Sequence, residues 1–531
     1  MSNNFFILKG LTALSLDKLP TPLWSAALVV AAATLPAIWI YRLALHPLAK
    51  YPGPELAACS SLYFMYYIWT GYFPQHCETL FRRYKSTVIR VAPGQLVFND
   101  PRSIKDIVGR SDVYRGNFAL RVIGFAGTNV SNIRDPGEHR RKRRLMAPGF
   151  SNTALNAQEP GIVVPIVDKL VSRIAGAETD VVNLSDYFDC ATLDIIGALS
   201  FGANFAMLDK LHDHPFLHVL PNVLRLSVIA QCIPEVFRFL SFINRHGPAW
   251  MTPKAFRGVV DFAGYHLNMR RQRDDTEFDL GSRQDIISII AAGNEKFKGQ
   301  AGYAHLGKYE MLGEATNLVT GETSFRHKIK SVDKLTRPGG GDTVATALTN
   351  TFWHLGQNPA VYERLVSEIR SEFLTSESIV SPKVAQKIPY LDAVINESMR
   401  VSPVLPGPMW RHTDNPIPVA GHMVPAHTEL GAMRYNIFRN PEVFHRADEF
   451  LPQRWMDRNG EFKNDDLEAS QPFGLGPRTC IGRNIAWMEL RLIVAKLLWH
   501  FDWEAVTKEW NCPEYLVLYR GAMLMKAKAR V

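Results

Sequence analysis

The sequence predicts a mainly α-helical protein with a minor β region, and three observations support this fold class. With 531 residues, of which 47% are hydrophobic and 21% charged, the chain has the composition of a packed globular protein. Runs typical of β-strands are confined to "TVIRVAPGQLVFND" at 87–100 and to the C-terminal "YLVLYRGAMLMKAKARV". Elsewhere apolar residues recur at helical spacing, as along 359–373. We therefore expect one large helical body, with the C-terminal run rejoining the β region.

Charge and cysteine usage limit the possible partners. The formal net charge of +9 is compatible with an anionic membrane or an acidic protein partner. We expect no nucleic-acid partner, because the chain shows neither zinc-finger spacing nor an RNA-binding signature. The cysteines lack C-x-x-C spacing, which argues against a disulfide framework or a structural zinc site. Cys480 has unusual neighbours, and we expect the other five to be buried thiols: Cys59, Cys77, Cys190, Cys232 and Cys512.

A long apolar segment near the N-terminus predicts a membrane anchor. Residues 23–41, "LWSAALVVAAATLPAIWIY", are uncharged and close to the roughly 20 residues that a bilayer-spanning helix needs. Pro36 is tolerated in such helices, although a buried hydrophobic helix is the alternative interpretation. We expect a lumenal segment at 1–22, the transmembrane helix at 23–41, a basic hinge at 42–54 that ends in "YPGP", and the catalytic body at 55–531.

The strongest signal for chemistry is "PFGLGPRTCIGRNIAWMEL". Its Cys480 lies in a loop between Gly476 and Gly482, directly before a segment with helical periodicity. Glycines let the backbone approach a planar ligand closely, and amides near a helix N-terminus stabilise a thiolate. Arg478 can pair with a carboxylate of the same ligand, and Phe473 can pack against the sulfur side. This stretch therefore predicts a cysteine that is prepared to bind a metal.

The spacing Phe-x-x-Gly-x-Arg-x-Cys-x-Gly resembles the haem-binding loop of the cytochrome P450 family, and this chain matches every named position. The resemblance implies haem b as the cofactor, with the Cys480 thiolate as the axial ligand of its iron. It also implies cofactor contacts from Phe473, Gly476, Arg478 and Gly482. The alternative is an ordinary buried cysteine in a glycine-rich turn. The fold implied is the cytochrome P450 fold with an N-terminal transmembrane anchor, which agrees with the helical body.

A second motif is the Glu-x-x-Arg pair in "YLDAVINESMR". Glu397 and Arg400 are three residues apart and so share one helical face, as a solvated surface ion pair also would. The resemblance implies that this pair is buried against the arginine of the downstream "FLPQRW", which is Arg454 here. We expect these three residues to form a structural core network on the haem side of the fold.

The basic run "HRRKRR" supplies a third match. His139-x-x-x-Arg143 stands where the family often has Trp-x-x-x-Arg in contact with a haem propionate, and Arg411 is similar to a further propionate contact, with His412 as a substitute. The alternative is a solvated basic helix face, and the two interpretations can coexist. We expect the rest of the run to present positive charge to an acidic electron-transfer partner: Arg140, Arg141, Lys142 and Arg144.

The fourth match is "GGGDTV", which resembles the oxygen-activation motif of the family. It places Asp342 and Thr343 at the acid and alcohol positions, which the resemblance makes catalytic. Oxygen activation requires protons, and a hydroxyl and a carboxylate can order the water that delivers them. A glycine-rich turn followed by a helix-capping Asp is the alternative interpretation.

The segment 321–338, "GETSFRHKIKSVDKLTRP", interrupts the helix that should carry this motif. Its basic residues and Pro338 do not suit the interior of a buried helix. When it is removed, the flanks join as "GEATNLVT" and "GGGDTVATAL", which resembles an uninterrupted family helix. We therefore interpret the segment as a non-native insertion, compatible with a translated intron, and a genuine looped-out insertion is the alternative.

The resemblance also implies a reaction and a location. The anchor and cysteine regions look like those of membrane-bound monooxygenases of filamentous fungi. We expect hydroxylation or epoxidation of a lipophilic terpenoid or polyketide intermediate with O2 and electrons from NADPH, delivered by a separate NADPH-cytochrome reductase. We expect a single-pass endoplasmic reticulum protein with a cytosolic catalytic domain. Apolar segments at 117–130, 216–230 and 404–409 could line the substrate pocket or belong to the core. The alternatives are a haem-thiolate isomerase or dehydratase that needs no O2, and an inactive haem-binding or scaffold protein if the insertion is real.

Overall fold

The computed structural model describes most of the predicted body and little of the predicted anchor. Most of 23–41 lies outside the described residues, as does 322–342, which includes Asp342. Among the residues that are described, no helix combines the length and the apolar run that a membrane span requires. The described residues are 34, 36–116, 129–211, 254–274, 285–296, 306–321, 343–457, 459–510, 512–514 and 520–530.

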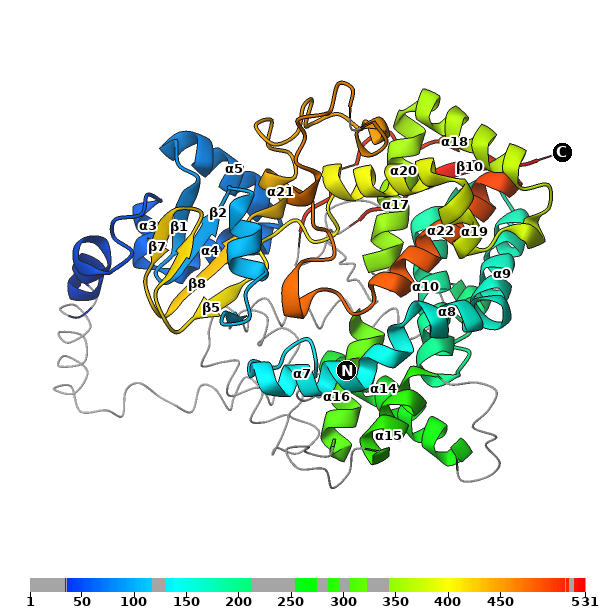
Figure 1. The fold of residues 1–531 in the computed structure, drawn as a ribbon, viewed down its shortest axis with the longest axis horizontal. Coiled ribbons are helices and arrows are strands. Elements are labelled where there is room, and N and C mark those ends of the chain that lie inside the picture. Colours follow the sequence, from blue (N-terminus) through cyan, green and yellow to red (C-terminus); the bar gives the residue numbers. More distant parts are fainter. Residues whose placement is uncertain are drawn as a thin grey trace, which may run out of the picture.

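The arrangement of helices and strands confirms a mainly α-helical fold with a minor β region. In Figure 1 the β-rich part lies on the left with short N-terminal helices, and the larger helical part lies on the right. The α-helices are α3 (Glu55–Cys59), α4 (Ser61–Thr70), α5 (Phe73–Tyr84), α7 (Pro136–Met146), α8 (Asn152–Gln158), α9 (Val164–Ala175), α10 (Leu184–Phe201), α11 (Met207–Lys210), α14 (Lys254–Asp274), α15 (Ile286–Lys296), α16 (Lys308–Gly321), α17 (Thr343–Gln357), α18 (Pro359–Glu372), α19 (Ser381–Lys387), α20 (Pro389–Val401), α21 (Arg434–Ile437) and α22 (Arg483–His500). The short 3-10 and π-helical turns are η2 (Tyr41–Leu45), η3 (Ile104–Val108), η5 (Ala147–Phe150), η6 (Glu159–Val163), η9 (Ser376–Ser378), η10 (Pro452–Trp455), η11 (Leu467–Ala469) and η12 (Gly476–Arg478).

The strands of the described region form three sheets. The largest has the order β1-β2-β8-β5-β3, in which the predicted hairpin around 93–94 pairs β1 with β2. The C-terminal run does form a strand, but the prediction that it rejoins this sheet is wrong, because β10 pairs with β4 and β9 in a separate sheet among the helices. The strands are β1 (Val88–Ala92), β2 (Gln95–Phe98), β3 (Tyr114–Arg115), β4 (Val181–Asn183), β5 (Arg411–Thr413), β6 (Ile417–Val419), β7 (His422–Val424), β8 (Thr428–Ala432), β9 (Phe501–Ala505) and β10 (Leu524–Ala529).

Local sequence explains where the helices nearest the site begin. The Asp135 side chain accepts a hydrogen bond of 2.7 Å from the Glu138 amide, and Pro136 occupies the first turn of α7, which is a favourable start for a helix. α18 and α20 also begin at prolines, as the predicted helix along 359–373 requires. α22 begins at Arg483, directly after the predicted metal-binding cysteine.

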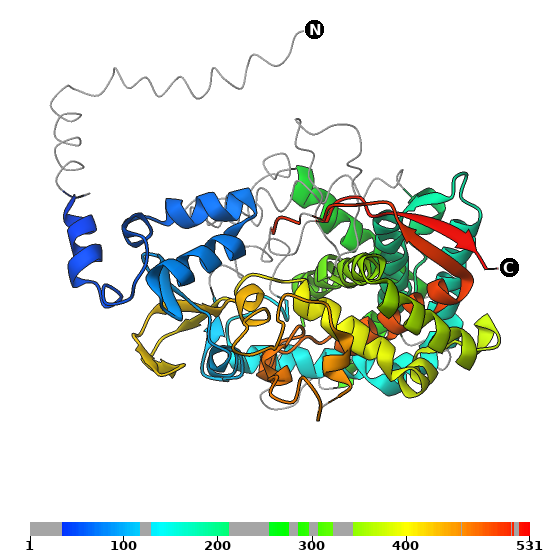
Figure 2. The same ribbon diagram turned by 90° about the horizontal axis from the view of Figure 1, so that it is seen from above.

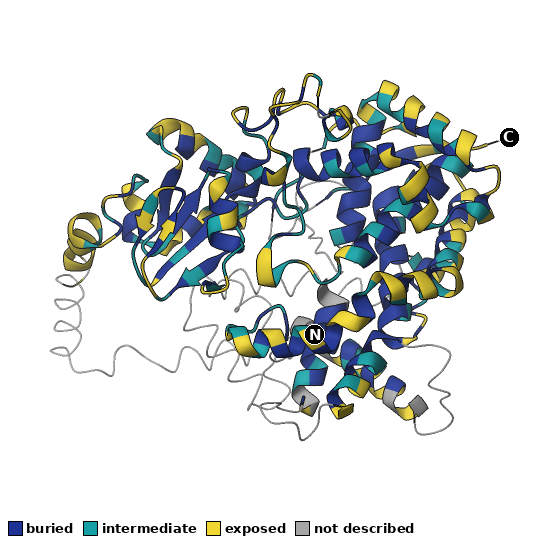
Figure 3. Ribbon diagram, viewed as in Figure 1, coloured by how far each residue is buried: buried dark blue, intermediate teal, exposed yellow. Residues whose placement is uncertain are grey.

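The main core is built from long helices that are almost wholly buried. In Figure 3 α10, α17 and α22 are mostly dark blue, because side chains on every face of α10 and α17 are covered by neighbouring elements. α16 ends at Gly321 and α17 begins at Thr343, so the described helices stop and resume on either side of 322–342. Both α16 and α17 contact α10.

Candidate functional site

The loop that carries Cys480 is closed by its own hydrogen bonds. The Cys480 amide donates to the Phe473 carbonyl at 2.9 Å, and the Thr479 amide donates to the Gly476 carbonyl at 3.1 Å. The Thr479 hydroxyl also donates to the Gly474 carbonyl at 3.2 Å. Cys480 itself is exposed. A thiol is therefore presented by a fixed loop just before the N-terminus of α22, where helix amides favour the thiolate.

Of the other predicted thiols, three are buried as expected, and Cys512 is half-buried. Burial raises the pKa of Cys77 and of Cys190, so both are protonated at neutral pH. Cys232 lies outside the described residues. Cys480 is the exposed cysteine of the described region, which suits a ligand and not a packing role.

The backbone geometry and packing of the cysteine loop explain two of its glycines. Gly476 has φ +70°, and a Cβ placed on it would lie 2.7 Å from the Gly109 carbonyl oxygen, so a larger residue would clash with the end of η3. Gly482 has an ordinary φ of −80° and caps α22, where its carbonyl accepts from the Ala486 amide at 2.9 Å. Phe473 packs with its ring centre 6.2 Å from that of Trp487 on α22.

Four arginines lie together beside this loop, and we call them the arginine cluster: Arg115, Arg411, Arg434 and Arg478. Arg115 on β3 is directly opposite Arg411 on β5. Burial, followed by the charges of its neighbours, holds the pKa of Arg411 well below its usual range. Burial and repulsion from Arg478 lower the pKa of Arg115 to about 10, and burial and repulsion from Arg115 lower that of Arg434 to about 10.

The arginine cluster lacks carboxylate partners within the described part of the chain, where no ion pair involves any of the four. Arg411 Nη1 donates only to the Trp410 carbonyl, at 3.2 Å, and Arg478 Nη2 donates to the Arg134 carbonyl at 3.0 Å. Arg411 Nη2 and Arg115 Nε are buried without a hydrogen-bond partner among those same residues. Buried charges are normally paired, because desolvating an unpaired one costs several kcal/mol. The cluster therefore has the donor chemistry of a site for a dianionic group, which fits the two propionates of haem.

His139 and Arg143 of α7 lie against the same cluster. His139 is buried, and burial together with Arg478 and Arg143 lowers its pKa to about 4, so the ring is neutral at neutral pH. Arg143 Nη1 donates to the Thr479 carbonyl at 2.7 Å, which ties α7 to the cysteine loop. Burial lowers the pKa of Arg143, and the nearby Cys480 opposes this shift. The structure thus places Arg143 beside Cys480 and His139 beside the arginine cluster, and their contact with a propionate stays a prediction.

The sequence prediction for the middle of the basic run is wrong. Arg141 and Lys142 are buried and do not face a partner protein. Arg141 pairs with Glu138 at 2.7 Å, and Lys142 pairs with Glu310 at 3.0 Å and Glu314 at 3.3 Å, both on α16. Arg140 and Arg144 are exposed, as predicted. The physical reason is the helix itself, which turns consecutive residues to different faces.

His412 does not share the environment of Arg411. Successive side chains of a strand point to opposite faces, and the His412 Nε2 atom lies 3.0 Å from Asp414 Oδ1 on the other face of β5. The suggestion that His412 substitutes for the propionate contact is therefore wrong.

The Glu-x-x-Arg network is confirmed. Glu397, Arg400 and Arg454 have fully buried side chains, and Glu397 pairs with Arg400 at 2.8 Å and with Arg454 at 2.9 Å. The Trp455 indole and the Leu451 amide each donate to the same carboxylate at 2.9 Å. Arg400 also donates to the carbonyls of three residues between α21 and η10, which fixes that loop region against α20: Phe438, Ala447 and Glu449.

The predicted proton-relay residues are only partly described. Thr343 is the first residue of α17 and is half-buried. Asp342 lies outside the described residues, as do most of the segments predicted to line a substrate pocket, 117–130 and 216–230. Their roles stay predictions.

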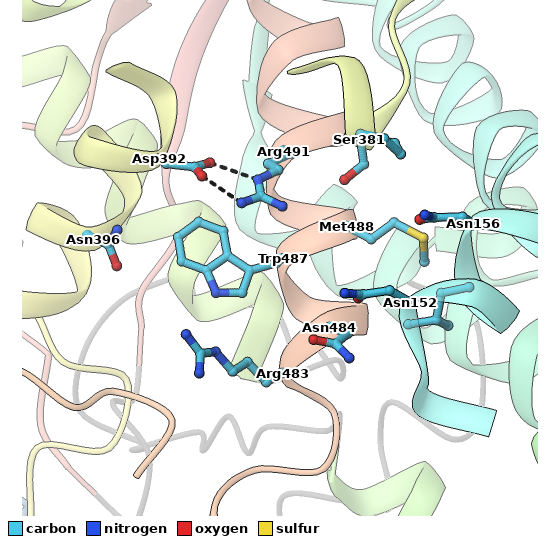
Figure 4. Close-up of a pocket in the computed structure, with 12 residues that line it drawn as sticks. Asn152, Asn156, Ser381, Asp392, Asn396, Arg483, Asn484, Trp487, Met488 and Arg491 are labelled. Atoms are coloured by element: carbon cyan, nitrogen blue, oxygen red, sulfur yellow. Dashed lines mark hydrogen bonds and ion pairs between the residues drawn. The ribbon is translucent and has the colours of Figure 1, made fainter. Parts of the chain in front are cut away.

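A polar cavity of about 560 Å³ lies beside the cysteine loop, between α8, α19, α20 and the first turns of α22. Figure 4 shows the Trp487 side chain between Arg483 and Arg491, with Arg491 bonded to Asp392 on α20. Amide and charged side chains dominate its wall, and it does not include the 404–409 segment expected to contact a lipophilic substrate. The cavity therefore does not match a site for an apolar molecule.

Arg115 and Arg434 were not predicted from the sequence. Each is a single arginine in a short segment without a motif, so no local pattern marks it. The strand register places Arg115 opposite Arg411, and a register is a tertiary property.

Comparisons with known proteins agree with this geometry. A family profile described as "Cytochrome P450" matches residues 61–528. The chain is 32% identical to the cytochrome P450 monooxygenase astJ of Aspergillus oryzae, over 92% of this chain and 94% of that protein. It is also 32% identical to the cytochrome P450 monooxygenase BOT4 of Botryotinia fuckeliana, over 90% and 84%, and to the averantin hydroxylase of Dothistroma septosporum, over 87% and 82%.

Proposed function

This chain belongs to the cytochrome P450 family, and from that membership we propose that it hydroxylates or epoxidises a lipophilic small molecule, a terpenoid or polyketide intermediate. Enzymes of this family are monooxygenases that carry haem with a cysteine thiolate as axial ligand. The observation that carries the proposal is an exposed Cys480 beside the arginine cluster, in which Arg411 and Arg434 are buried and no member has a carboxylate partner in the described region. A fungal relative is named averantin hydroxylase, and this name supports hydroxylation as the reaction type.

The residues of the chain divide the work at this site. Cys480 would hold the iron, and the arginine cluster with His139 and Arg143 would hold the propionates. When bound, haem supplies the iron chemistry that activates O2 and transfers one oxygen atom to the substrate. Thr343, at the start of α17, and Asp342 would together deliver a proton for the activation of O2. Phe473 packs against Trp487 and so connects the cysteine loop with α22.

We propose an acidic reductase that uses NADPH as the electron donor. The support is a set of exposed arginines around the cysteine loop: Arg140 and Arg144 on α7, and Arg483 at the start of α22. The polar cavity beside α22 adds asparagine side chains with which a partner could form hydrogen bonds. Charge reversal at Arg140 and Arg144 should slow reduction by the reductase more at low than at high ionic strength.

We propose the endoplasmic reticulum membrane as the location, with one transmembrane helix at 23–41 and the catalytic domain at 55–531 in the cytosol. The support is the apolar sequence of 23–41 and the exposed apolar side chains of the elements that follow it. Figure 2 shows these N-terminal elements at one end of the molecule. Carbonate extraction and protease protection of microsomes test this location. The exposed side chains after residue 41 include Leu45, Leu56, Leu62, Tyr66 and Trp69.

We also propose that 321–338 is absent from the working protein. The support is that α16 ends where the segment begins and that α16 and α17 contact the same helix, α10. A spliced transcript that retains the segment as its major form would refute this proposal.

The carbon-monoxide difference spectrum of the reduced protein tests the assignment. We expect the haem-thiolate Soret band in the chain without 321–338, and its loss in the same chain with Cys480→Ser. If neither the full chain nor the deletion variant shows the band, the haem-thiolate assignment fails. If both show it, the segment is a tolerated insertion. Product formation without NADPH and O2 would instead support an isomerase or dehydratase.

A further inference from the structure

Three potential metal ligands converge on the face of the large sheet that points away from the arginine cluster. They are His412 on β5, Asp414 directly after β5, and His427 directly before β8. One ligand atom from each lies within 4.8 Å of the others. His412 Nε2 is 3.0 Å and His427 Nδ1 is 3.9 Å from Asp414 Oδ1. We call these three residues the His-Asp-His group.

The backbone holds the His-Asp-His group in place. β5 and β8 are antiparallel neighbours, and the His427 amide donates to the Thr413 carbonyl at 2.7 Å. His412 has 12% of its side chain exposed and Asp414 42%, whereas His427 has 77% exposed. Two ligands are therefore fixed by the sheet, and the third can adjust its rotamer to meet an ion that arrives from solvent.

We propose that the His-Asp-His group is a binding site for one borderline divalent cation, of which Zn²⁺ is the probe. Two imidazoles and one carboxylate are typical ligands of zinc, and such sites keep the fourth position for water. Ligands about 2.0–2.1 Å from zinc in a tetrahedral site are roughly 3.4 Å apart, so the observed separations require shifts that the exposed His427 side chain can supply. Mg²⁺ and Ca²⁺ prefer all-oxygen ligands and should not bind here.

Arg134 is the competitor of the cation. Its Nη2 atom lies 3.0 Å from Asp414 Oδ1, the same oxygen that His412 contacts. The Arg134 side chain is 40% exposed and its guanidinium also lies 5.3 Å from the centre of the Tyr114 ring. An entering cation must displace this guanidinium from the carboxylate, and the contact with Tyr114 gives Arg134 an alternative position. Removing the guanidinium should therefore strengthen cation binding. If Arg134 and Asp414 formed only a structural ion pair, removal of the guanidinium would not increase the affinity for a cation.

The site is distinct from the haem site although it is close in sequence. His412 follows Arg411 in β5, and strand alternation points the two side chains to opposite faces. None of the three ligands is Cys480 or a member of the arginine cluster. Zinc binding can therefore be measured on the haem-loaded protein, and its failure would leave the haem-thiolate assignment unaffected.

Isothermal titration calorimetry of the haem-loaded full chain with Zn²⁺ tests the proposal. We expect the parent chain to bind one Zn²⁺ ion. His427→Asn and Asp414→Asn should each weaken this binding by at least about tenfold, because removal of even a supporting residue of a metal site causes a loss of that size. Asn tolerates the left-handed backbone of His427, which has φ +58°, so the first variant should fold. Arg134→Ala should bind Zn²⁺ more tightly than the parent chain does.

His445→Asn is the matched control, because His445 is another exposed histidine beside a carboxylate, 3.2 Å from Glu461. It should bind Zn²⁺ as the parent chain does. The proposal is overturned if the parent chain binds no Zn²⁺, if His427→Asn gives the parent isotherm, or if Mg²⁺ binds as tightly as Zn²⁺. Weaker binding by Arg134→Ala would also overturn it, because the arginine would then support the site.

Discussion

Replacing Arg411 by Leu should weaken haem retention without the stability loss that normally follows removal of a buried arginine. Arg411 is 1% exposed, is surrounded by the other members of the arginine cluster, and makes one hydrogen bond that the structure records, to the Trp410 carbonyl. Removing it ends the repulsion between Arg411 and Arg115, its partner across β3 and β5. In the protein without haem the variant should therefore be as stable as the parent chain or more stable.

The expected loss of haem affinity follows from the contact that Leu cannot make. A hydrogen bond to a charged group contributes about 1.5–3 kcal/mol. Every 1.4 kcal/mol is a factor of ten in a dissociation constant. If Arg411 makes one such bond to a propionate, Arg411→Leu should raise the haem dissociation constant by about 10- to 100-fold. The Soret band should stay that of a thiolate complex, because Cys480 is unchanged.

Transfer of haem to excess apomyoglobin measures the affinity change, and urea unfolding measures stability. Arg520→Leu is the matched control, because Arg520 is equally buried, at 2% exposed, but pairs with the buried Asp189. The control should lose about 3–5 kcal/mol of stability, because it leaves a buried carboxylate without its partner. The reasoning is refuted if Arg411→Leu releases haem at the parent rate, or if it destabilises the haem-free protein as much as the control does.

Two further predictions concern buried carboxyl groups. Glu397→Gln removes the negative charge between Arg400 and Arg454 and should lower the free energy of unfolding in urea by about 3–5 kcal/mol. The control Glu78→Gln, in an exposed helix pair, should change it by less than about 1 kcal/mol. Equal effects of the two variants would contradict the proposed importance of burial. Burial raises the pKa of Glu514 to about 8 from 4.5, so the folded protein holds a proton that the unfolded chain releases. The proton-linked contribution to stability is therefore complete below about pH 4.5 and is lost as the pH rises to about 8. The always-neutral Glu514→Gln variant should therefore raise the melting temperature relative to the parent chain more near pH 9 than near pH 5, and an equal difference at both would argue against a raised pKa.

The sequence predicted those parts of the site that a short segment contains. The cysteine loop lies within 473–482, and the hydrogen bonds that close it join residues that are neighbours in the chain. The Glu-x-x-Arg pair is equally local, since both residues lie on one face of α20. Arg454 could be assigned only through the family resemblance, because its distance from Glu397 in sequence gives no physical reason for their contact.

The basic run of α7 shows why the rest of the site was harder to predict from the sequence. In the sequence the run is a continuous series of basic residues. In a helix each successive residue is rotated by about 100°, so neighbouring residues of the run face different surroundings. The face of Arg140 and Arg144 points to solvent, Arg143 points to the cysteine loop, and Lys142 points to α16, where it pairs with two acids four residues apart. Glu310 and Glu314 in a largely apolar helix were the available signal for this burial.

The contacts on either side of 322–342 bear on whether that segment is part of the working enzyme. α16 is held by Lys142 of α7, which pairs with two of its glutamates, and by the Val130 amide, which donates to Glu314 at 3.1 Å. α17 is held by other partners: Arg520 donates to the Thr346 hydroxyl, and Asn350 donates to the Ser402 carbonyl at 3.0 Å. These contacts hold α16 and α17 to parts of the chain outside 321–338. None of the residues that make these contacts belongs to 321–338, so a chain that joins "GEATNLVT" directly to "GGGDTV" keeps the side chains that hold both helices.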